Sequence, residues 1–302
     1  MFCLSMISRR HVLFAGGLLA LHAATSSRTL VAASSNRLGG LSDSLAQLEK
    51  DNNGRLGVAV LDTGSGESSG YRTNERFAMC STFKMLLAAA VLRRCDTGKE
   101  SLDRTIIMPI TGFLGNSPIT QEHAGRGMTI RELCAAIITR SDNTGANLLL
   151  DTIGGPSEMT QFARTLGDTV TRLDRTETSL NEALPGDPRD TTSPTAMVAN
   201  WSKVLVGNTL SPSSRKQLTD WLIANKTGDE RLRKGLPAGW IVGDKTGSNG
   251  ENTSNDVAII WPAKRPPVIV AAYLTACPGT EAKRNAVLAE VGTLVVKHIQ
   301  SA

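Results

Sequence analysis

A serine and a lysine that could act as nucleophile and base lie three residues apart in Ser81-Thr82-Phe83-Lys84. The following residues are spaced as in a helix, so the two side chains face the same way, nearly one turn apart. A helix N-terminus favours negative charge that develops on a reacting oxygen. A lysine amine becomes a usable base when it is partly desolvated and lies near another cation. The pair indicates nucleophilic catalysis, although the spacing alone also occurs in ordinary helix starts.

Two further motifs carry groups that suit the same chemistry. In Ser141-Asp142-Asn143, the hydroxyl could relay a proton and the asparagine amide could hold a substrate carbonyl, although such a triplet also caps helices. In Lys245-Thr246-Gly247, the ammonium and the hydroxyl suit a substrate carboxylate, and the glycine lets a ligand approach the backbone. Taken alone, each motif is also compatible with a purely structural role.

Histidine is scarce, which excludes several kinds of active site. The chain has four histidines, and His11 and His22 lie in the leader described below. The remaining His123 and His298 give no basis for a Ser-His-Asp triad, an H-E-x-x-H motif or a histidine-rich metal site. If the protein is a hydrolase, we expect its base not to be histidine, and we expect no metal and no other cofactor.

The three motifs, in this order, resemble those of the class A serine β-lactamases and of the related penicillin-binding proteins. The likeness covers essentially the whole mature chain. The stretch Arg175–Asn181 also resembles the E-x-x-L-N segment of the β-lactamase Ω loop, in which Glu177 would activate water against the acyl-enzyme and Asn181 would help to hold it. The resemblance therefore implies hydrolysis of β-lactam antibiotics, penicillins and cephalosporins, through a covalent acyl-serine, and hence β-lactam resistance.

Two other functions also use Ser81 and Lys84. One is a D-alanyl-D-alanine carboxypeptidase of the same fold, and the other is a non-enzymatic β-lactam sensor that is acylated without turnover. Glu177 and Asn181 favour the hydrolase, because penicillin-binding transpeptidases lack this deacylating pair. The lack of a receptor-like transmembrane segment favours it too.

The resemblance assigns a role to each matched residue. Ser81 is the nucleophile, and Lys84 and Glu177 share the role of acylation base. Ser141 relays a proton to the lactam nitrogen, and the backbone N–H groups of Ser81 and Ser248 form the oxyanion hole. The remaining matched positions bind substrate or the hydrolytic water: Asn143, Asn181, Lys245, Thr246, Gly247, Ser248 and Arg231.

Some positions depart from the family pattern. Asn116 stands where an aromatic residue is common, which leaves stacking of a substrate there in doubt. Thr178 replaces the proline that commonly follows the catalytic glutamate, yet we expect a cis peptide bond between Glu177 and Thr178. The resemblance also implies an ion pair between Arg175 and Asp190 at the neck of the Ω loop.

The cysteines predict no disulfide. Cys80 precedes the nucleophile, as in some family members, but the partner cysteine expected near Asn249 is absent. Cys134 matches one half of a disulfide found in some members, but Ala88 holds the other position.

Strand patterns near both ends and helical patterns between them predict the organisation of the chain. Strands are expected at Leu56–Leu61, Gly239–Val242, Asp256–Trp261 and Val268–Thr275, and a closing amphipathic helix at Glu281–Ile299. Helices are expected between the strands from Ser81 to about Arg94 and over Thr129–Thr139, Thr144–Thr152, Pro156–Leu166 and Ser193–Val206.

We therefore expect an α/β domain from residues 37–75 and 224–302 and an all-α domain from residues 76–223, which includes the Ω loop at 175–190. The resemblance implies the two-domain fold of β-lactamases and penicillin-binding proteins, in which an antiparallel sheet is flanked by helices and the helical domain is inserted between its two parts. The active site would then lie in the cleft between the domains.

The first 33 residues resemble an export signal. Arg9 and Arg10 precede an apolar run that is too short to span a membrane. The string Ser8-Arg9-Arg10-His11-Val12-Leu13 favours a twin-arginine signal, with a Sec signal as the alternative. The leader carries three arginines and no acidic residue, so the mature chain is close to neutral although the whole chain has a pI near 9.1. We expect a periplasmic monomer that binds a small-molecule β-lactam and neither nucleic acid nor membrane.

Overall fold

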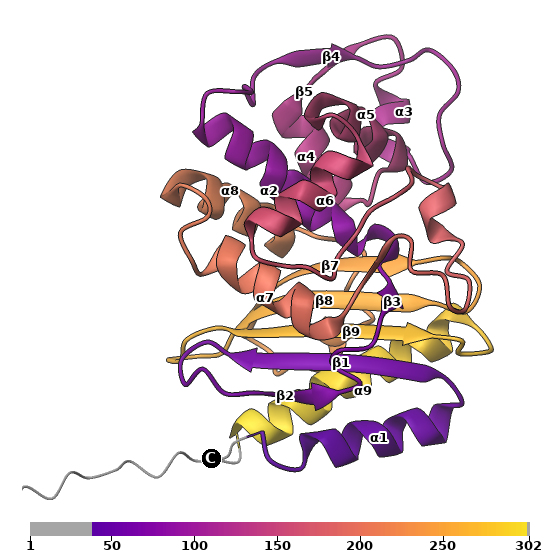
Figure 1. The fold of residues 1–302 in the computed structure, drawn as a ribbon, viewed down its shortest axis with the longest axis vertical. Coiled ribbons are helices and arrows are strands. Elements are labelled where there is room, and N and C mark those ends of the chain that lie inside the picture. The colour runs from indigo at the N-terminus through magenta and orange to yellow at the C-terminus, as the bar shows by residue number, and fades with distance from the viewer. Residues whose placement is uncertain (1–37, 301–302) are drawn as a thin grey trace, which may run out of the picture. The chain divides into compact units, whose positions relative to one another are not determined.

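The computed structural model describes residues 38–300, which form an antiparallel sheet with helices on both faces (Figure 1). The sheet has five strands in the order β2-β1-β9-β8-β7. Their bounds are β1 Arg55–Asp62, β2 Ser68–Tyr71, β7 Ile241–Ser248, β8 Ser254–Trp261 and β9 Val268–Thr275. Strands from the two ends of the chain thus share one sheet, as predicted. The predicted export signal, residues 1–33, lies outside the described residues.

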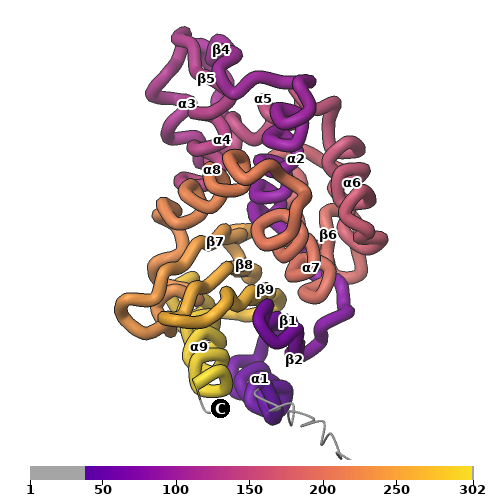
Figure 2. Tube along the Cα trace, turned by 90° about the vertical axis from the view of Figure 1, so that its left-hand side faces the viewer, coloured from indigo at the N-terminus to yellow at the C-terminus, as the bar shows by residue number. Residues whose placement is uncertain are grey.

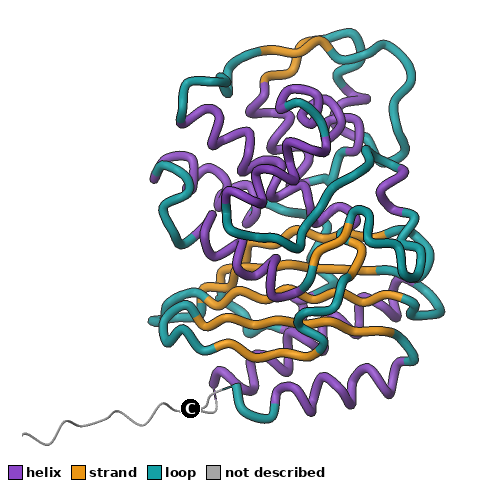
Figure 3. The backbone as a smooth tube through the Cα atoms, viewed as in Figure 1, coloured by secondary structure: helices purple, strands orange, loops and turns teal. Residues whose placement is uncertain are grey.

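The side chains of each strand alternate between two hydrophobic cores. On β1, Leu56, Val58 and Val60 join the core under α1 (Leu41–Asn52) and α9 (Glu281–Gln300), and Ala59 joins the core under the middle helices. This alternation follows from the period of two in a strand. Both faces are therefore apolar and covered, as the layer of strands between helices shows in Figure 3.

The middle of the chain is mostly helical and covers the second face of the sheet (Figure 2). At its centre, α2 (Phe83–Asp96) is buried over ten consecutive residues from Phe83 to Leu92, so it packs against neighbours on all sides. The other helices of this part are α3 Pro118–Glu122, α4 Ile130–Thr139, α5 Asn143–Ile153, α6 Pro156–Thr165, α7 Pro194–Leu205 and α8 Pro212–Ile223. The short elements are β3 Phe77–Ala78, η1 Cys80–Thr82, β4 Thr105–Ile107, β5 Gly127–Thr129, η2 Ser179–Asn181, β6 Thr191–Thr192 and η3 Leu232–Gly235.

The predicted strands and helices are all present, with different bounds in places. Strand β7 runs on to Ser248, because the polar residues after Val242 continue the ladder with β8. Three helices were not predicted: α1, α3 and α8. In α1 only Leu41 and Leu45 are buried among polar residues, so the apolar stripe is too narrow to read from the sequence. The domain boundaries at residues 75 and 223 remain a prediction.

The burial of α1 leads to a stability prediction. Leu45 is fully buried, so Leu45→Ala should lower the free energy of unfolding by about 2–5 kcal/mol, since it removes apolar contact and leaves a cavity. The matched control is Leu184→Ala, because Leu184 is 55% exposed and should change the unfolding free energy by only about 0.5 kcal/mol. Denaturant unfolding of both variants measures the difference. Equal stabilities would contradict the packing of α1.

Candidate active site

Ser81 lies in a tight turn that leads into the buried helix α2. It belongs to η1, and the preceding Cys80 has a positive φ of 45°. Strand β7 packs directly on this turn at Gly247, where a Cβ would stand 2.7 Å from the Met79 carbonyl oxygen and 3.2 Å from the Ser81 nitrogen. Only glycine allows this approach, which brings the end of β7 beside the backbone of Ser81.

Lys84 follows on the first turn of α2 and is fully buried. Its ammonium contacts the Glu177 carboxylate (Nζ to Oε1, 2.9 Å), donates to the Ser141 carbonyl oxygen (2.8 Å) and donates to Asn143 Oδ1 (2.6 Å). Burial lowers the pKa of Lys84, and the neighbouring Glu177 carboxylate partly offsets this effect. The amine can therefore exchange a proton more readily than an exposed lysine.

Glu177 reaches the same point from the opposite side, on the loop between α6 and α7. Its carboxylate accepts a hydrogen bond from the Ser81 hydroxyl (Oγ to Oε1, 3.4 Å) and another from Asn181 Nδ2 (to Oε2, 2.7 Å). The Glu177–Thr178 peptide bond is cis, which confirms the expectation. One carboxylate thus links the nucleophile, the buried lysine and the asparagine expected to hold water.

The Ω loop is closed at its neck by the ion pair that the resemblance implied. Arg175 Nε donates to Asp190 Oδ2 (2.6 Å). The other oxygen of Asp190 accepts from the backbone N–H groups of Asp174 (2.7 Å) and Arg175 (3.0 Å). Because Asp190 is buried, these bonds fix the two ends of the loop beside each other.

Ser141 contacts both buried lysines of the site, Lys84 and Lys245. Ser141 has a positive φ of 57°, and its hydroxyl oxygen lies 3.4 Å from Lys84 Nζ and 3.2 Å from Lys245 Nζ. Burial and the neighbouring Lys84 charge lower the pKa of Lys245 to about 7. The hydroxyl connects the two amines, which is the arrangement that a proton relay requires.

Asn143 and Arg231, which were predicted to bind substrate, donate their hydrogen bonds to other groups of the protein. Asn143 accepts from Lys84 and donates through Nδ2 to the Gly115 carbonyl (2.7 Å). Arg231 is buried, and its guanidinium donates to the carbonyls of Gly247 and Asn255 and to the side chains of Asn285 and Glu281. In the structure described here, both side chains position other parts of the site.

The other predicted substrate-binding residues lie along the last part of β7. Thr246 is buried, and its hydroxyl pairs with that of Thr227 (2.5 Å). Ser248 is half-buried at the end of the strand, where its hydroxyl donates to the Thr253 carbonyl (3.2 Å). The residues predicted from separate motifs therefore lie close together, and Gly247 is where β7 meets the Ser81 turn.

Sequence reasoning missed Asn147, which holds Glu177 from α5. Its amide Nδ2 donates to the Glu177 carbonyl oxygen, and its Oδ1 accepts from the Glu177 backbone N–H, both at 2.9 Å. Asn147 lies one helical turn after Asn143, so the i, i+4 spacing of two asparagines at a helix start was the available signal. Asn116 was noted only for the missing aromatic, yet its amide donates to the Ser141 carbonyl (3.0 Å).

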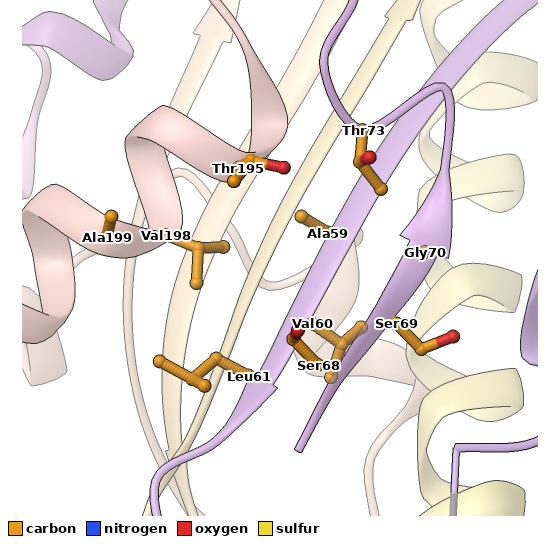
Figure 4. A pocket seen from close by; sticks show the side chains of 10 residues that line it. All are labelled: Ala59, Val60, Leu61, Ser68, Ser69, Gly70, Thr73, Thr195, Val198 and Ala199. Carbon is orange, nitrogen blue, oxygen red and sulfur yellow. The ribbon is translucent and has the colours of Figure 1, made fainter. Parts of the chain in front are cut away.

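One hollow in the described residues, away from Ser81, lacks this chemistry. It lies between β1, β2 and α7, is about 440 Å³ in volume, and is lined by ten residues of which none is titratable (Figure 4). Within residues 38–300, no group of three or more histidine, cysteine or acidic side chains is placed to hold a metal ion. No helix of that part is both long and apolar enough to cross a membrane.

Comparisons with known proteins agree with this geometry. Residues 40–299 match the model of the beta-lactamase enzyme family. The chain is 50% identical over 250 residues to beta-lactamase L2 of Stenotrophomonas maltophilia, covering 82% of each chain. It is 46% identical to beta-lactamase CTX-M-8 of Citrobacter amalonaticus over 83% of this chain and 86% of that one.

Solved structures give the same result. An ancestral (GNCA) class A beta-lactamase superposes with a TM-score of 0.84 at 60% identity, over 85% of this chain and 98% of the other. A putative class A beta-lactamase, PenP from Rhodopseudomonas palustris, has a TM-score of 0.84 at 54% identity, over 85% and 98%. These matches confirm the predicted fold and the resemblance that its motifs carried: the chain belongs to the beta-lactamase enzyme family, as a class A serine β-lactamase.

Proposed function

We propose that this enzyme opens the β-lactam ring of penicillins and cephalosporins by transferring the acyl group to Ser81, and that Glu177 then directs water onto the ester. The observation that carries the proposal is the buried contact between Lys84 Nζ and Glu177 Oε1 (2.9 Å) beside the Ser81 hydroxyl. A serine is a weak nucleophile until an adjacent base accepts its proton. Here the Glu177 carboxylate contacts the Ser81 hydroxyl and is itself paired with the Lys84 amine.

In acylation, the Ser81 oxygen attacks the lactam carbonyl while its proton passes to the Lys84–Glu177 pair. The carbon–nitrogen bond of the ring breaks, and the ring nitrogen takes a proton through Ser141. The contacts of the Ser141 hydroxyl with Lys84 and Lys245 support this relay. The backbone N–H groups of Ser81 and Ser248 stabilise the oxyanion, supported by the close packing at Gly247.

In deacylation, Glu177 accepts a proton from a water molecule that attacks the acyl carbonyl. The ester bond breaks, the hydrolysed product leaves, and Ser81 regains its proton. Asn181 supports this role, because its amide reaches Glu177 Oε2 and fixes the carboxylate (2.7 Å). The two hydrogen bonds between the Asn147 amide and the Glu177 backbone also hold Glu177 in position.

The substrate carboxylate is bound by Lys245, Thr246 and Ser248. Arg231 supports this subsite from behind through the Gly247 carbonyl, to which its Nη1 donates (2.9 Å). Asn143 acts mainly by holding Lys84, given that both ends of its amide are bonded.

We also infer that the enzyme acts as a periplasmic monomer that is exported by the twin-arginine route. The leader pattern supports export of a folded protein. The four cysteines of the described part, Cys80, Cys95, Cys134 and Cys277, are free thiols, which suits folding in a reducing cytosol.

Glu177→Gln should uncouple the two halves of the reaction. The amide keeps the size of the side chain but cannot accept the proton of water, so deacylation should slow by about 10²–10⁴-fold, more than acylation. Mass spectrometry after mixing with a penicillin should show a lasting acyl adduct on Ser81. Glu158→Gln, at an exposed position on α6, is the control and should clear the adduct as the unmodified enzyme does. Clearance at the normal rate by Glu177→Gln would refute the role of Glu177.

Substrate binding should take up protons above neutral pH. Lys245 has a pKa of about 7, so at pH 8 it is mostly neutral, and a bound carboxylate favours its charged form. Calorimetry of a penicillin binding to Ser81→Ala, in buffers of different ionisation enthalpy, should give an uptake that rises from pH 6 to pH 8. Adding Lys245→Arg, which stays charged, should remove the uptake. Equal uptake with and without this second change would contradict the assignment.

A further inference from the structure

Asn255 connects the sheet to the nucleophile turn. It lies on β8, it is 1% exposed, and its register partner across the ladder is Gly247 of β7. Its amide Nδ2 donates to the carbonyls of Ala78 (2.9 Å) and Met79 (3.1 Å). These carbonyls belong to the segment that leads directly into Ser81, so one side chain ties this segment to the strand next to β7.

The Met79 carbonyl is the point where the nucleophile turn meets the sheet. Besides the bond from Asn255, it accepts from the backbone N–H of Thr82 (3.2 Å) and from the Thr82 hydroxyl (2.8 Å). It is also the atom nearest to the position of a Cβ on Gly247. The location of this carbonyl therefore sets how closely the Ser81 turn sits against β7.

The backbone of Asn255 is fixed as firmly as its side chain. Arg231 Nη1 donates to the Asn255 carbonyl (2.7 Å) and to the Gly247 carbonyl (2.9 Å), so it joins β7 and β8 at this one register pair. Arg231 holds the two strands together, and the Asn255 amide reaches from the second strand to the turn. The contacts of Arg231 and of the Asn255 amide therefore fix the backbone on both sides of Gly247.

We propose that Asn255 is a positioning residue that sets the distance between the Ser81 and Ser248 backbone N–H groups, the two donors of the oxyanion hole. The inference rests on the proposed function, which assigns those donors. One donor lies on the turn and the other on β7 directly after Gly247, and Asn255 fixes the first relative to the second. An oxyanion hole works only when both donors point at one oxygen position, so this spacing acts on the transition state.

The proposed role of Asn255 depends on the N–H donor of its side-chain amide. Its Oδ1 has no hydrogen-bond partner among the described residues, although it is buried, whereas its Nδ2 serves two carbonyls. An ionised aspartate would repel both carbonyls, and leucine would remove the hydrogen bonds that tie both carbonyls to β8. A protonated aspartic acid could still donate one hydrogen bond.

The test compares Asn255→Leu with Asn200→Leu. Asn200, on α7, is also a buried asparagine without a partner for Oδ1, but its Nδ2 donates to Asp168, outside the active site. We expect Asn255→Leu to slow acylation and deacylation each by about tenfold, less than the loss of an oxyanion donor itself, with little change in non-covalent substrate binding. Asn200→Leu should lower the melting temperature without this kinetic change.

Asn255→Asp gives a readout that a purely structural role would not move. Burial raises the pKa of a carboxyl group, so the aspartic acid can be protonated at pH 6 and donate a hydrogen bond. With both rates expressed relative to the unmodified enzyme, acylation by Asn255→Asp should therefore be faster than acylation by Asn255→Leu at pH 6. The inference is overturned if Asn255→Leu keeps normal rate constants, if Asn200→Leu loses as much, or if Asn255→Asp is no better than Asn255→Leu at pH 6. Absence of turnover in the unmodified enzyme would instead refute the proposed function.

Discussion

The buried ion pair between Lys84 and Glu177 is the constraint on which the rest of the site depends. Both side chains are fully removed from solvent, and removing a charge from water costs several kcal/mol. The pair is tolerated because each partner has further hydrogen bonds: Lys84 to Ser141 and Asn143, and Glu177 to Asn181. The central helix α2, the start of α5 and the Ω loop must therefore meet at one point, and the neck of the loop is fixed to make this possible.

A second buried lysine lies next to the ion pair. Lys245 lies on the other side of the Ser141 hydroxyl, and the Lys84 charge opposes its protonation. Under the proposed function, the carboxylate of a bound substrate would favour the charged form of Lys245. The proposed function therefore couples substrate binding to the protonation of Lys245, and it uses lysine, glutamate and serine side chains in place of histidine.

The sequence predicted the family and much of the fold, because the motifs and the hydrophobic patterns are local. The motifs around Ser81, Ser141, Glu177 and Lys245 each carry a recognisable spacing, and the strands and long helices carry hydrophobic periods. What it could not predict are contacts made across the chain. Asn147 clamps a residue 30 positions away, and Asn255 reaches one 176 positions away. Buried amides of this kind leave no periodic signal, and α1 and α8 leave little because each buries only a few apolar residues.

Acylation of Ser81 followed by clearance of the ester by Glu177 would distinguish a hydrolase from a carboxypeptidase or a sensor of the same fold. The most direct measurement is rapid-quench mass spectrometry of the unmodified enzyme with an excess of a chromogenic β-lactam. We predict hydrolysis of many equivalents per enzyme molecule, with an adduct on Ser81 that forms and disappears on the time scale of turnover. A single stoichiometric burst that leaves a lasting adduct would contradict the account.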